Sequence, residues 1–408
     1  ALTVFENIAL GLDKTLKKNE LKKRILDVSK EYGLSISLDK IVGNLSAGER
    51  QRIEIIRCLL LNPKIMIMDE PTSVLTPGEV SDLFSVLKKL SNAGMSILYI
   101  SHKLEEIRTL CTKATIMRRG QVVKECDPQN ISTSKIAEEM VGTSFSSPKK
   151  SKFKKGKECL KINNLSFKPL DPFGIPIRNL NLKIHHGEIL GIGGVAGNGQ
   201  EEFLSLLSGE LKPTNGSLLF DGQDITKLNV VERRNKGLLT APEERLGHAA
   251  VPVMTLTENC LITAEHRMNL SKKGFIDYES SKKLSDEIIK KLDVRTSGSD
   301  ALARSLSGGN LQKFVIGREL IQKPKIFIVN QPTWGVDAAA ASSIRQQILD
   351  LAKDGAAVIV ISQDLDELLE ISDVFCALVG GQLSSPENTS ELNPSKIGML
   401  ISNSKEQV

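Results

Sequence analysis

The sequence has no apolar run near the roughly 20 residues that an α-helix needs to cross a bilayer. Its six cysteines include no C-x-x-C pair, which argues against a zinc site and against a disulfide framework. No signal-peptide pattern opens the chain. We therefore expect a protein of a reducing compartment that inserts no segment into a membrane, so that any membrane association is made through partners.

Charge of one sign is also scarce, because 54 Lys and Arg residues nearly balance 49 Asp and Glu residues and leave a net charge of +5. Much of this excess lies in one basic run, residues 149–157. Such a run is most often a solvated linker, so it predicts a domain boundary rather than contact with nucleic acid. A chain of 408 residues with 40% hydrophobic residues has enough material for two or three domains with full cores.

What the sequence does contain is an internal repeat. A shift of 261 positions carries residues 45–49, Leu-Ser-Ala-Gly-Glu, onto residues 306–310, Leu-Ser-Gly-Gly-Asn. The same shift carries residues 69–72, Asp-Glu-Pro-Thr, onto residues 330–333, Asn-Gln-Pro-Thr, and His102 onto Gln363. The chain is therefore a tandem duplication in which amides replace the acidic and imidazole groups of the first copy. Only the first copy has groups suited to hydrolysis.

Short apolar runs that end in polar residues predict buried parallel strands. Residues 65–68 lead into Asp69, and residues 96–100 lead into Ser101 and His102. Residues 187–192 lead into a glycine-rich loop before a helix that begins at Glu201, and residues 21–32 have helical periodicity. Strands that alternate with helices form a doubly wound α/β sheet, in which functional side chains gather at the carboxyl ends of the strands.

These motifs resemble the signature, Walker B and H-loop series of ATP-binding cassette (ABC) proteins. The tandem arrangement is similar to that of the ATPase subunits of bacterial sugar and nucleoside importers, and the resemblance covers nearly the whole chain. It implies two tandem P-loop nucleotide-binding domains of the α/β class, each with a helical subdomain, that use ATP and Mg2+. We place the first cassette at residues 1–144, a basic linker at 145–158 and the second cassette at 159–408.

We expect the first cassette to be incomplete. Residues 1–8 begin as if in mid-domain and match residues 254–260, with Glu6 and Asn7 aligned on Glu258 and Asn259. If the second copy starts near Cys159, the first copy lacks the counterpart of residues 159–252, which includes the phosphate loop. We therefore interpret the sequence as an N-terminally truncated fragment and expect little ATPase activity from the fragment alone.

The resemblance assigns the hydrolytic chemistry to three residues of the first copy. Asp69 would hold Mg2+ through water, Glu70 would polarise the attacking water, and His102 would contact the γ-phosphate. Thr76 departs from the pattern, because many such domains have an aspartate there, as the second copy does at Asp337. This departure leaves open how strongly the two sites are coupled.

Each signature opens a predicted helix, where backbone N–H groups and a serine hydroxyl can approach phosphate oxygens. By resemblance each signature acts across a dimer interface, so the second signature would complete the competent site and the first would complete the degenerate one. The candidate residues are Ser307, Gly308, Gly309 and Asn310 in the second signature, and Ser46, Ala47, Gly48 and Glu49 in the first.

The phosphate loop of the second copy departs from the pattern G-x-x-x-x-G-K-[ST]. Gln200 replaces the lysine that neutralises phosphates, and Glu201 replaces the hydroxyl that binds Mg2+. Asn330, Gln331 and Gln363 remove the metal carboxylate, the base and the histidine. The glycines can still wrap a nucleotide through backbone N–H groups, and an empty structural loop is the alternative. The candidate nucleotide-binding residues are Gly194, Gly197, Asn198, Gly199, Gln200 and Glu201.

The resemblance implies an ATPase subunit that is peripheral to the cytoplasmic face of the bacterial inner membrane. It would power import through two permease subunits, with a solute-binding lipoprotein of the same system. The phosphate loop and the Pro-Glu-Glu-Arg turn at 242–245 resemble the nucleoside branch more than the ribose or galactose branch. The alternatives are a soluble tandem cassette that acts on ribosomes as a translation factor and a non-catalytic nucleotide-binding module.

Overall fold

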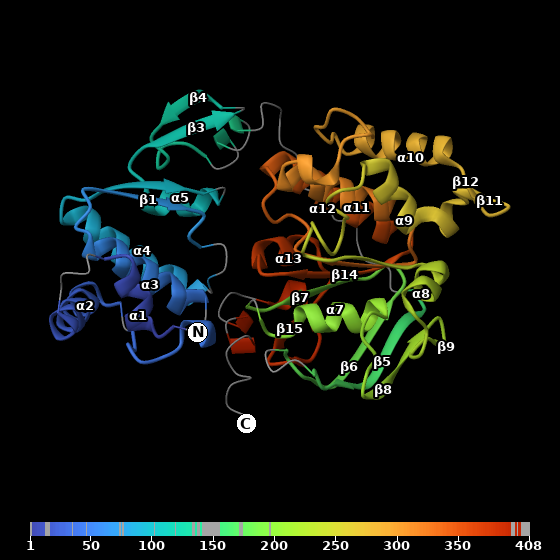
Figure 1. Ribbon diagram of the computed structural model, residues 1–408, viewed down its shortest axis with the longest axis horizontal. Helices are drawn as coiled ribbons and strands as arrows, with labels where there is room; N and C mark the ends of the chain where they lie inside the picture. The colour runs from blue at the N-terminus through green and yellow to red at the C-terminus, as the bar shows by residue number, and fades with distance from the viewer. Residues whose placement is uncertain are drawn as a thin grey trace. The chain divides into compact units, whose positions relative to one another are not determined.

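The computed structural model of the chain divides into two compact units, Ala1–Phe145 and Ser146–Val408. Figure 1 colours the first unit from blue to cyan and the second from green to red. The predicted domain limits stay predictions, and residues 145–155 of the predicted linker lie outside the described residues. The structure describes residues 2–12, 17–34, 36–45, 47–72, 75, 77–101, 103–118, 120–132, 135–136, 139–140, 156–170, 174–195, 197–392, 396–397 and 399–400.

The first unit opens with helices, and local sequence explains where they start and end. Thr3 and Glu6 form a capping box that starts α1, because each side chain bonds the other residue's backbone N–H. Gly33 ends α2 with a φ of 72°. The elements are α1 (Val4–Leu10), α2 (Lys18–Tyr32), η1 (Val42–Asn44), α3 (Ala47–Leu60), β1 (Ile65–Asp69), α4 (Pro77–Asn92), β2 (Ser96–Ile100), α5 (Leu104–Leu110), β3 (Ala114–Arg118) and β4 (Gln121–Cys126).

Strands β1 and β2 pair in parallel, as predicted, but they are not fully buried. Met66 and Met68 belong to the core cluster formed with α3 and α4, whereas Ile65 and Ile67 are each 66% exposed. The expectation of buried strands was therefore wrong for this unit. A strand's own apolar sequence does not decide its burial, since each face needs another element packed against it.

The second unit is built on a mostly parallel sheet with the strand order β10-β13-β14-β7-β15-β16, and β17 pairs with β15. An antiparallel sheet with the order β6-β5-β8-β9 packs beside it (Figure 1). The elements up to α10 are β5 (Glu158–Phe167), β6 (Ile177–His185), β7 (Ile189–Gly193), α7 (Gln200–Ser208), β8 (Asn215–Phe220), β9 (Gln223–Asp224), α8 (Val230–Lys236), β10 (Leu238–Ala241), α9 (Leu256–Met268), β11 (Ser271–Lys272), β12 (Phe275–Ile276) and α10 (Tyr278–Lys291).

Both faces of this parallel sheet are buried, which confirms the predicted doubly wound α/β architecture. Ile326 and Ile328 pack in the cluster with α7 and the antiparallel sheet, while Phe327 and Val329 pack in the cluster with α9 to α12. The remaining elements are η2 (Ala303–Ser305), α11 (Gly308–Leu320), β13 (Ile326–Asn330), α12 (Ala338–Lys353), β14 (Ala357–Ser362), α13 (Leu365–Ile371), β15 (Val374–Val379), β16 (Gln382–Leu383), β17 (Glu387–Asn388) and η3 (Thr389–Glu391).

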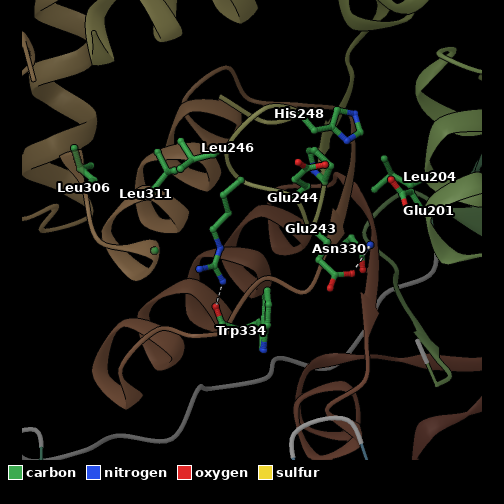
Figure 2. Close-up of a pocket in the computed structure, with 13 residues that line it drawn as sticks. Glu201, Leu204, Glu243, Glu244, Leu246, His248, Leu306, Leu311, Asn330 and Trp334 are labelled. Atoms are coloured by element: carbon green, nitrogen blue, oxygen red, sulfur yellow. Dashed lines mark hydrogen bonds between the residues drawn. The ribbon is translucent and has the colours of Figure 1, made fainter. Parts of the chain in front are cut away.

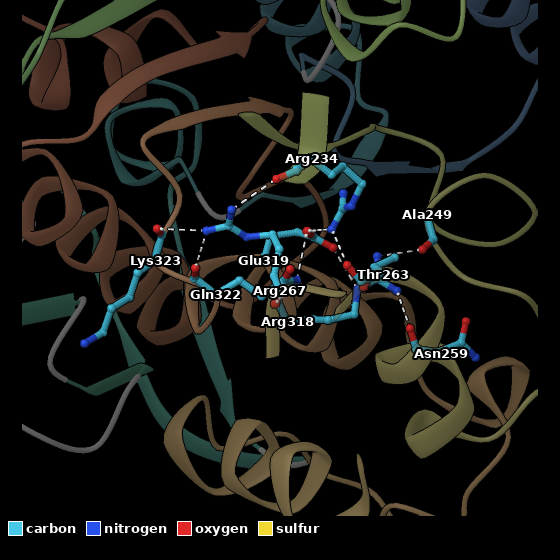
Figure 3. Close-up of polar contacts among 9 residues, drawn as sticks. All are labelled: Arg234, Ala249, Asn259, Thr263, Arg267, Arg318, Glu319, Gln322 and Lys323. Carbon is cyan, nitrogen blue, oxygen red and sulfur yellow. Dashed lines mark hydrogen bonds and ion pairs between the residues drawn. The ribbon is translucent and has the colours of Figure 1, made fainter. Parts of the chain in front are cut away.

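A buried ionic network fixes α11 against α8 and α9 (Figure 3). Glu319 on α11 is fully buried and accepts hydrogen bonds from Arg318 at 2.8 Å and from Arg234 at 2.5 Å. Arg318 also donates to the carbonyl oxygens of Asn259 and Ala249. Buried charges are tolerated only when they are paired and hydrogen-bonded, as these are. No helix in the described part of the chain is long and apolar enough to cross a membrane.

Candidate functional site

The carboxyl end of β1 places the two acidic residues predicted to act on the nucleotide. Asp69 is the last residue of the strand and is exposed. Glu70 follows with a φ of +46°, and its N–H donates to the carbonyl oxygen of Ile100 at the end of β2, at 2.9 Å. A left-handed backbone is unusual for glutamate, so a sharp turn after Asp69 is part of the site. His102 comes two residues after β2 and lies outside the described residues.

A buried carboxylate ties together the segments on which Glu70 and His102 lie. Glu106 on α5 accepts hydrogen bonds from Thr72 at 2.6 Å, from the Tyr99 hydroxyl at 2.7 Å and from Ser101 at 3.2 Å. Burial and the Glu106 carboxylate raise the pKa of Tyr99, so its hydroxyl stays a donor. The motifs do not point to Glu106, but the repeat does, since the shift of 261 places Glu367 at the same position.

The second unit repeats this backbone with amide side chains. Asn330 ends β13, and Gln331 follows with a φ of +53°. The Gln331 N–H donates to the carbonyl oxygen of Ile361 at 2.8 Å. The Gln331 side-chain oxygen accepts from the N–H of Gln363 at 3.5 Å, and Ser362 donates to Glu367 at 2.8 Å. The turn geometry is therefore the same in both units, whereas the groups that could act on a nucleotide differ.

The glycine-rich loop of the second unit is braced by its own amide side chains. The Gln200 amide nitrogen donates to the carbonyl of Val195 at 2.9 Å, and the Gln200 amide oxygen accepts from the N–H of Asn198 at 3.0 Å. Asn198 also donates to Val195 at 2.8 Å and accepts from the N–H of Gly380 at 2.9 Å. Gly197 and Gly199 have φ angles of +78° and +102°, which favour glycine. A phosphate would have to displace Gln200 to reach the Asn198 N–H.

A cavity of about 580 Å³ lies beside the first turn of α7 (Figure 2). Glu201, Glu243 and Asn330 line it together, and Asn330 donates to Glu243 at 3.4 Å. Burial, helped by the charge of Glu201, raises the pKa of Glu243. Glu201 and Asn330, at the positions predicted for the Mg2+-binding hydroxyl and carboxylate, therefore meet Glu243 on a wall that also contains Glu244, Arg245 and His248. A glutamate in place of the hydroxyl and an amide in place of the carboxylate do not fit a Mg2+-nucleotide complex.

Arg245 connects the turn at 242–245 to α11 and to the segment after β13. Its guanidinium donates to Gln312 at 2.9 Å and to the carbonyl oxygen of Trp334, and it lies 5.1 Å from the centre of the Trp334 ring. The buried Gln312 in turn donates to the carbonyl oxygen of Gln331 at 3.2 Å. Burial lowers the pKa of Arg245. Trp334 and the turn are therefore joined by direct contacts.

The second signature opens α11 without a side-chain cap on its backbone. Ser307 is the N-cap residue, and its hydroxyl oxygen accepts instead from the Asn310 amide at 2.9 Å. Gly308 and Gly309 follow as the first two residues of the helix. A cavity of about 340 Å³ adjoins these residues, and Arg295 and Lys313 also line it.

The first signature is described in part. Ser46 lies outside the described residues, and Ala47 and Gly48 are described only as the first backbone residues of α3. Glu49 forms an ion pair with Lys40 at 3.2 Å. The roles predicted for these residues, like those of the second signature, stay predictions.

The ABC transporter family matches residues 1–73 and 177–334 of the chain. The nucleoside import ATP-binding protein NupA of Lactococcus lactis subsp. cremoris is 36% identical, over 98% of this chain and 80% of that protein. The chain belongs to the ABC transporter family. The ribose import ATP-binding protein RbsA of Oceanobacillus iheyensis is 33% identical, over 97% of this chain and 79% of that protein.

A solved structure supports the tandem-cassette fold. The crystal structure of the archaeal ribosome recycling factor aABCE1, in complex with the ribosomal stalk protein aP1, has a TM-score of 0.63. The similarity covers 95% of this chain and 71% of that chain at 21% sequence identity. This likeness concerns the fold alone. The assignment of Asp69 and Glu70 to the Walker B position of the first cassette, and of Asn330 and Gln331 to that of the second, stays a prediction.

Proposed function

We propose that the chain supplies the ATPase of an ABC importer with the Walker B residues of the first cassette, and that these residues hydrolyse ATP once a phosphate loop completes that cassette. One observation carries this proposal. Asp69 and Glu70 lie at the carboxyl end of a parallel strand, on the same backbone turn that holds Asn330 and Gln331 in the second cassette. The first pair can bind a metal and polarise water, and the second pair cannot.

In this proposal the carboxylates of the first cassette divide the work. Asp69 is an exposed oxygen ligand at a strand end, which fits Mg2+, and it would hold the ion through water. Mg2+ would supply positive charge next to the phosphate oxygens of ATP. Glu70 would orient and polarise the attacking water, and His102 would contact the γ-phosphate. Ser307 to Asn310 would supply hydroxyl and N–H donors to the phosphates of a competent site.

The second cassette would transmit structural change rather than hydrolyse ATP. Its phosphate loop is braced by Gln200, and Glu201 and Glu243 would repel a phosphate. The Arg245 contacts link the turn at 242–245 to the signature helix and to the Walker B segment. A movement of that turn by a permease would therefore be passed to α11.

The solute is proposed to be a nucleoside or a related ribose-containing compound. The relative named for nucleoside import is 36% identical to the chain, and the relative named for ribose import is 33% identical. The form of the phosphate loop and of the turn at 242–245 points the same way. Two permease subunits and a solute-binding lipoprotein would complete the transporter, with this subunit at the cytoplasmic face of the inner membrane.

Reconstitution of the transporter in lipid vesicles, with a subunit that also contains a first-cassette phosphate loop, tests the proposal. Uptake of labelled nucleosides, ribose and hexoses is measured together with phosphate release. We expect nucleoside uptake coupled to hydrolysis, and a loss of about 100-fold or more in hydrolysis for Glu70→Gln. The matched variant Gln331→Glu should neither abolish hydrolysis nor add a second active site. Hydrolysis that survives Glu70→Gln would contradict the catalytic assignment, and uptake of hexoses alone would contradict the solute.

A further inference from the structure

The cavity beside the second signature contains a cation that the mechanism above does not use. Arg295 lies in the loop after α10, is exposed, and lines the 340 Å³ cavity together with Ser307 and Gly308. Within the described ranges, no residue forms a hydrogen bond or ion pair with its guanidinium. The other charged groups on this wall are engaged, because Lys313 donates to the carbonyl of Asp293 at 3.0 Å and Asp337 caps α12. Arg295 is therefore the cation that a ligand in this cavity would meet.

Asn310 holds the backbone of Arg295 next to Ser307. Its amide oxygen accepts from the N–H of Arg295 at 2.9 Å, and its amide nitrogen donates to the hydroxyl oxygen of Ser307 at 2.9 Å. The Arg295 N–H can only donate, so the orientation of the Asn310 amide is determined. Because the Ser307 oxygen accepts from Asn310, its own hydrogen remains to be donated to a ligand. One side chain thus positions both groups.

The donors that meet here match a phosphate. The first N–H groups of the 13-residue helix α11 receive no side-chain cap, and the helix dipole favours an anion at this end. A guanidinium binds phosphate oxygens with two parallel hydrogen bonds. The serine hydroxyl, the helix N–H groups and Arg295 therefore offer three kinds of donor to one anion.

The first signature differs at the position of Asn310. The shift of 261 places Glu49 there. The Glu49 carboxylate pairs with Lys40 at 3.2 Å. A carboxylate next to the first signature would oppose a phosphate where the second signature offers an amide.

We propose that Arg295 binds the phosphate chain of the ATP that the second signature serves, and that Asn310 positions Arg295 and Ser307 for this contact. The ligand class is a nucleoside triphosphate. The inference rests on the proposed function, because that function assigns this signature to the competent site. Arg295 adds a charge to the recognition of ATP that the signature motif alone does not contain.

The test measures KM for ATP and kcat of the assembled transporter with Arg295→Ala and Arg295→Gln. We expect KM for ATP to rise about tenfold or more for both, because a charged hydrogen bond to phosphate is lost. Arg295→Lys should recover part of the affinity for ATP, since lysine keeps the positive charge but cannot donate the two parallel hydrogen bonds of a guanidinium. Asn310→Ala should raise KM similarly, and the double variant with Arg295→Ala should be little worse than either single variant.

Arg304→Ala is the matched control. Arg304 is also an exposed arginine, lies three residues before Ser307, and does not line the cavity. Its KM should stay within about twofold of the wild type, since surface charges act weakly at a distance. A KM within twofold for Arg295→Ala, or an equal rise for Arg304→Ala, would overturn the role of Arg295. A wild-type transporter that hydrolyses no ATP would instead overturn the proposed function.

Discussion

The two cassettes share their backbone at the Walker B turn and differ in its chemistry. Glu70 and Gln331 have φ angles of +46° and +53°, and their N–H groups bond the next strand at 2.9 and 2.8 Å. Buried Glu106 accepts from a serine and a threonine hydroxyl, and buried Glu367 accepts from the matching serine, Ser362. The left-handed turn is therefore kept where no catalytic carboxylate is present. The turn is therefore a feature of the backbone at the strand ends, and it forms with or without carboxylate side chains.

The largest difference between the cassettes is expected when the two signature serines are changed. Ser307→Arg is expected to lower ATP turnover by about 100-fold or more, since a bulky cation would block the phosphates and remove a hydroxyl donor at the competent site. The corresponding change in the first signature, Ser46→Arg, should leave most of the ATP turnover, because that signature would serve the degenerate site. Steady-state phosphate release from the assembled transporter distinguishes the two. Equal losses from both variants would contradict a single working site.

Much of the fold could be predicted because its signals are local. The apolar runs gave the strands that end at Asp69 and Ile100, and the small residues of the signatures marked the starts of α3 and α11. The burial of β1 could not be predicted in this way. Ile328 is buried by α7 and the antiparallel sheet, whereas Ile67, at the matching position, is 66% exposed. Which element covers a strand is not encoded in the strand.

In the candidate site too, residues with a local sequence signal could be predicted, and residues that depend on distant partners could not. The motifs point to Asp69, Glu70 and the signature serines because each motif is a short run with its own chemistry. They do not point to Glu106, and they mark the turn that contains Arg245 without indicating its partner Trp334, which is 89 residues away in the sequence. The internal repeat supplies part of the missing signal, because Glu106 and Glu367 occupy equivalent positions.

The packing difference between the cassettes gives a prediction of intermediate size. Ile328→Ala should lower the local free energy of opening of β13 by about 2–5 kcal/mol, because it leaves a cavity in a closed core. Ile67→Ala should lower that of β1 by about 1 kcal/mol or less, since its side chain is mostly exposed. Hydrogen exchange on peptides from the two strands measures both values. Similar losses in the two strands would show that Ile67 packs as closely as Ile328.

The smallest expected effect concerns an ion pair in the second cassette at positions that have no counterpart in the first copy under the shift. Glu210, just after α7, pairs with His248 at 3.0 Å. Hydrogen bonding to His248 lowers the pKa of Glu210, and hydrogen bonding to Glu210 raises the pKa of His248. The charges of Glu201 and Glu244 also favour protonated His248. The pair joins the phosphate-loop helix to the loop that follows Arg245.

The sign of the pH dependence follows from these two shifts. The His248 contribution is complete below its ordinary pKa of 6.5 and is lost as pH rises through the raised value, while the Glu210 contribution is complete above 4.5 and is lost as pH falls through the lowered value. The pair should therefore stabilise the second cassette most between about pH 4.5 and 6.5. The gain should be about 1 kcal/mol or less, because both side chains are partly exposed. Urea unfolding of wild type and His248→Ala at pH 5.5 and pH 8.5 measures it, and a stability difference that is equal at the two pH values would contradict the pairing.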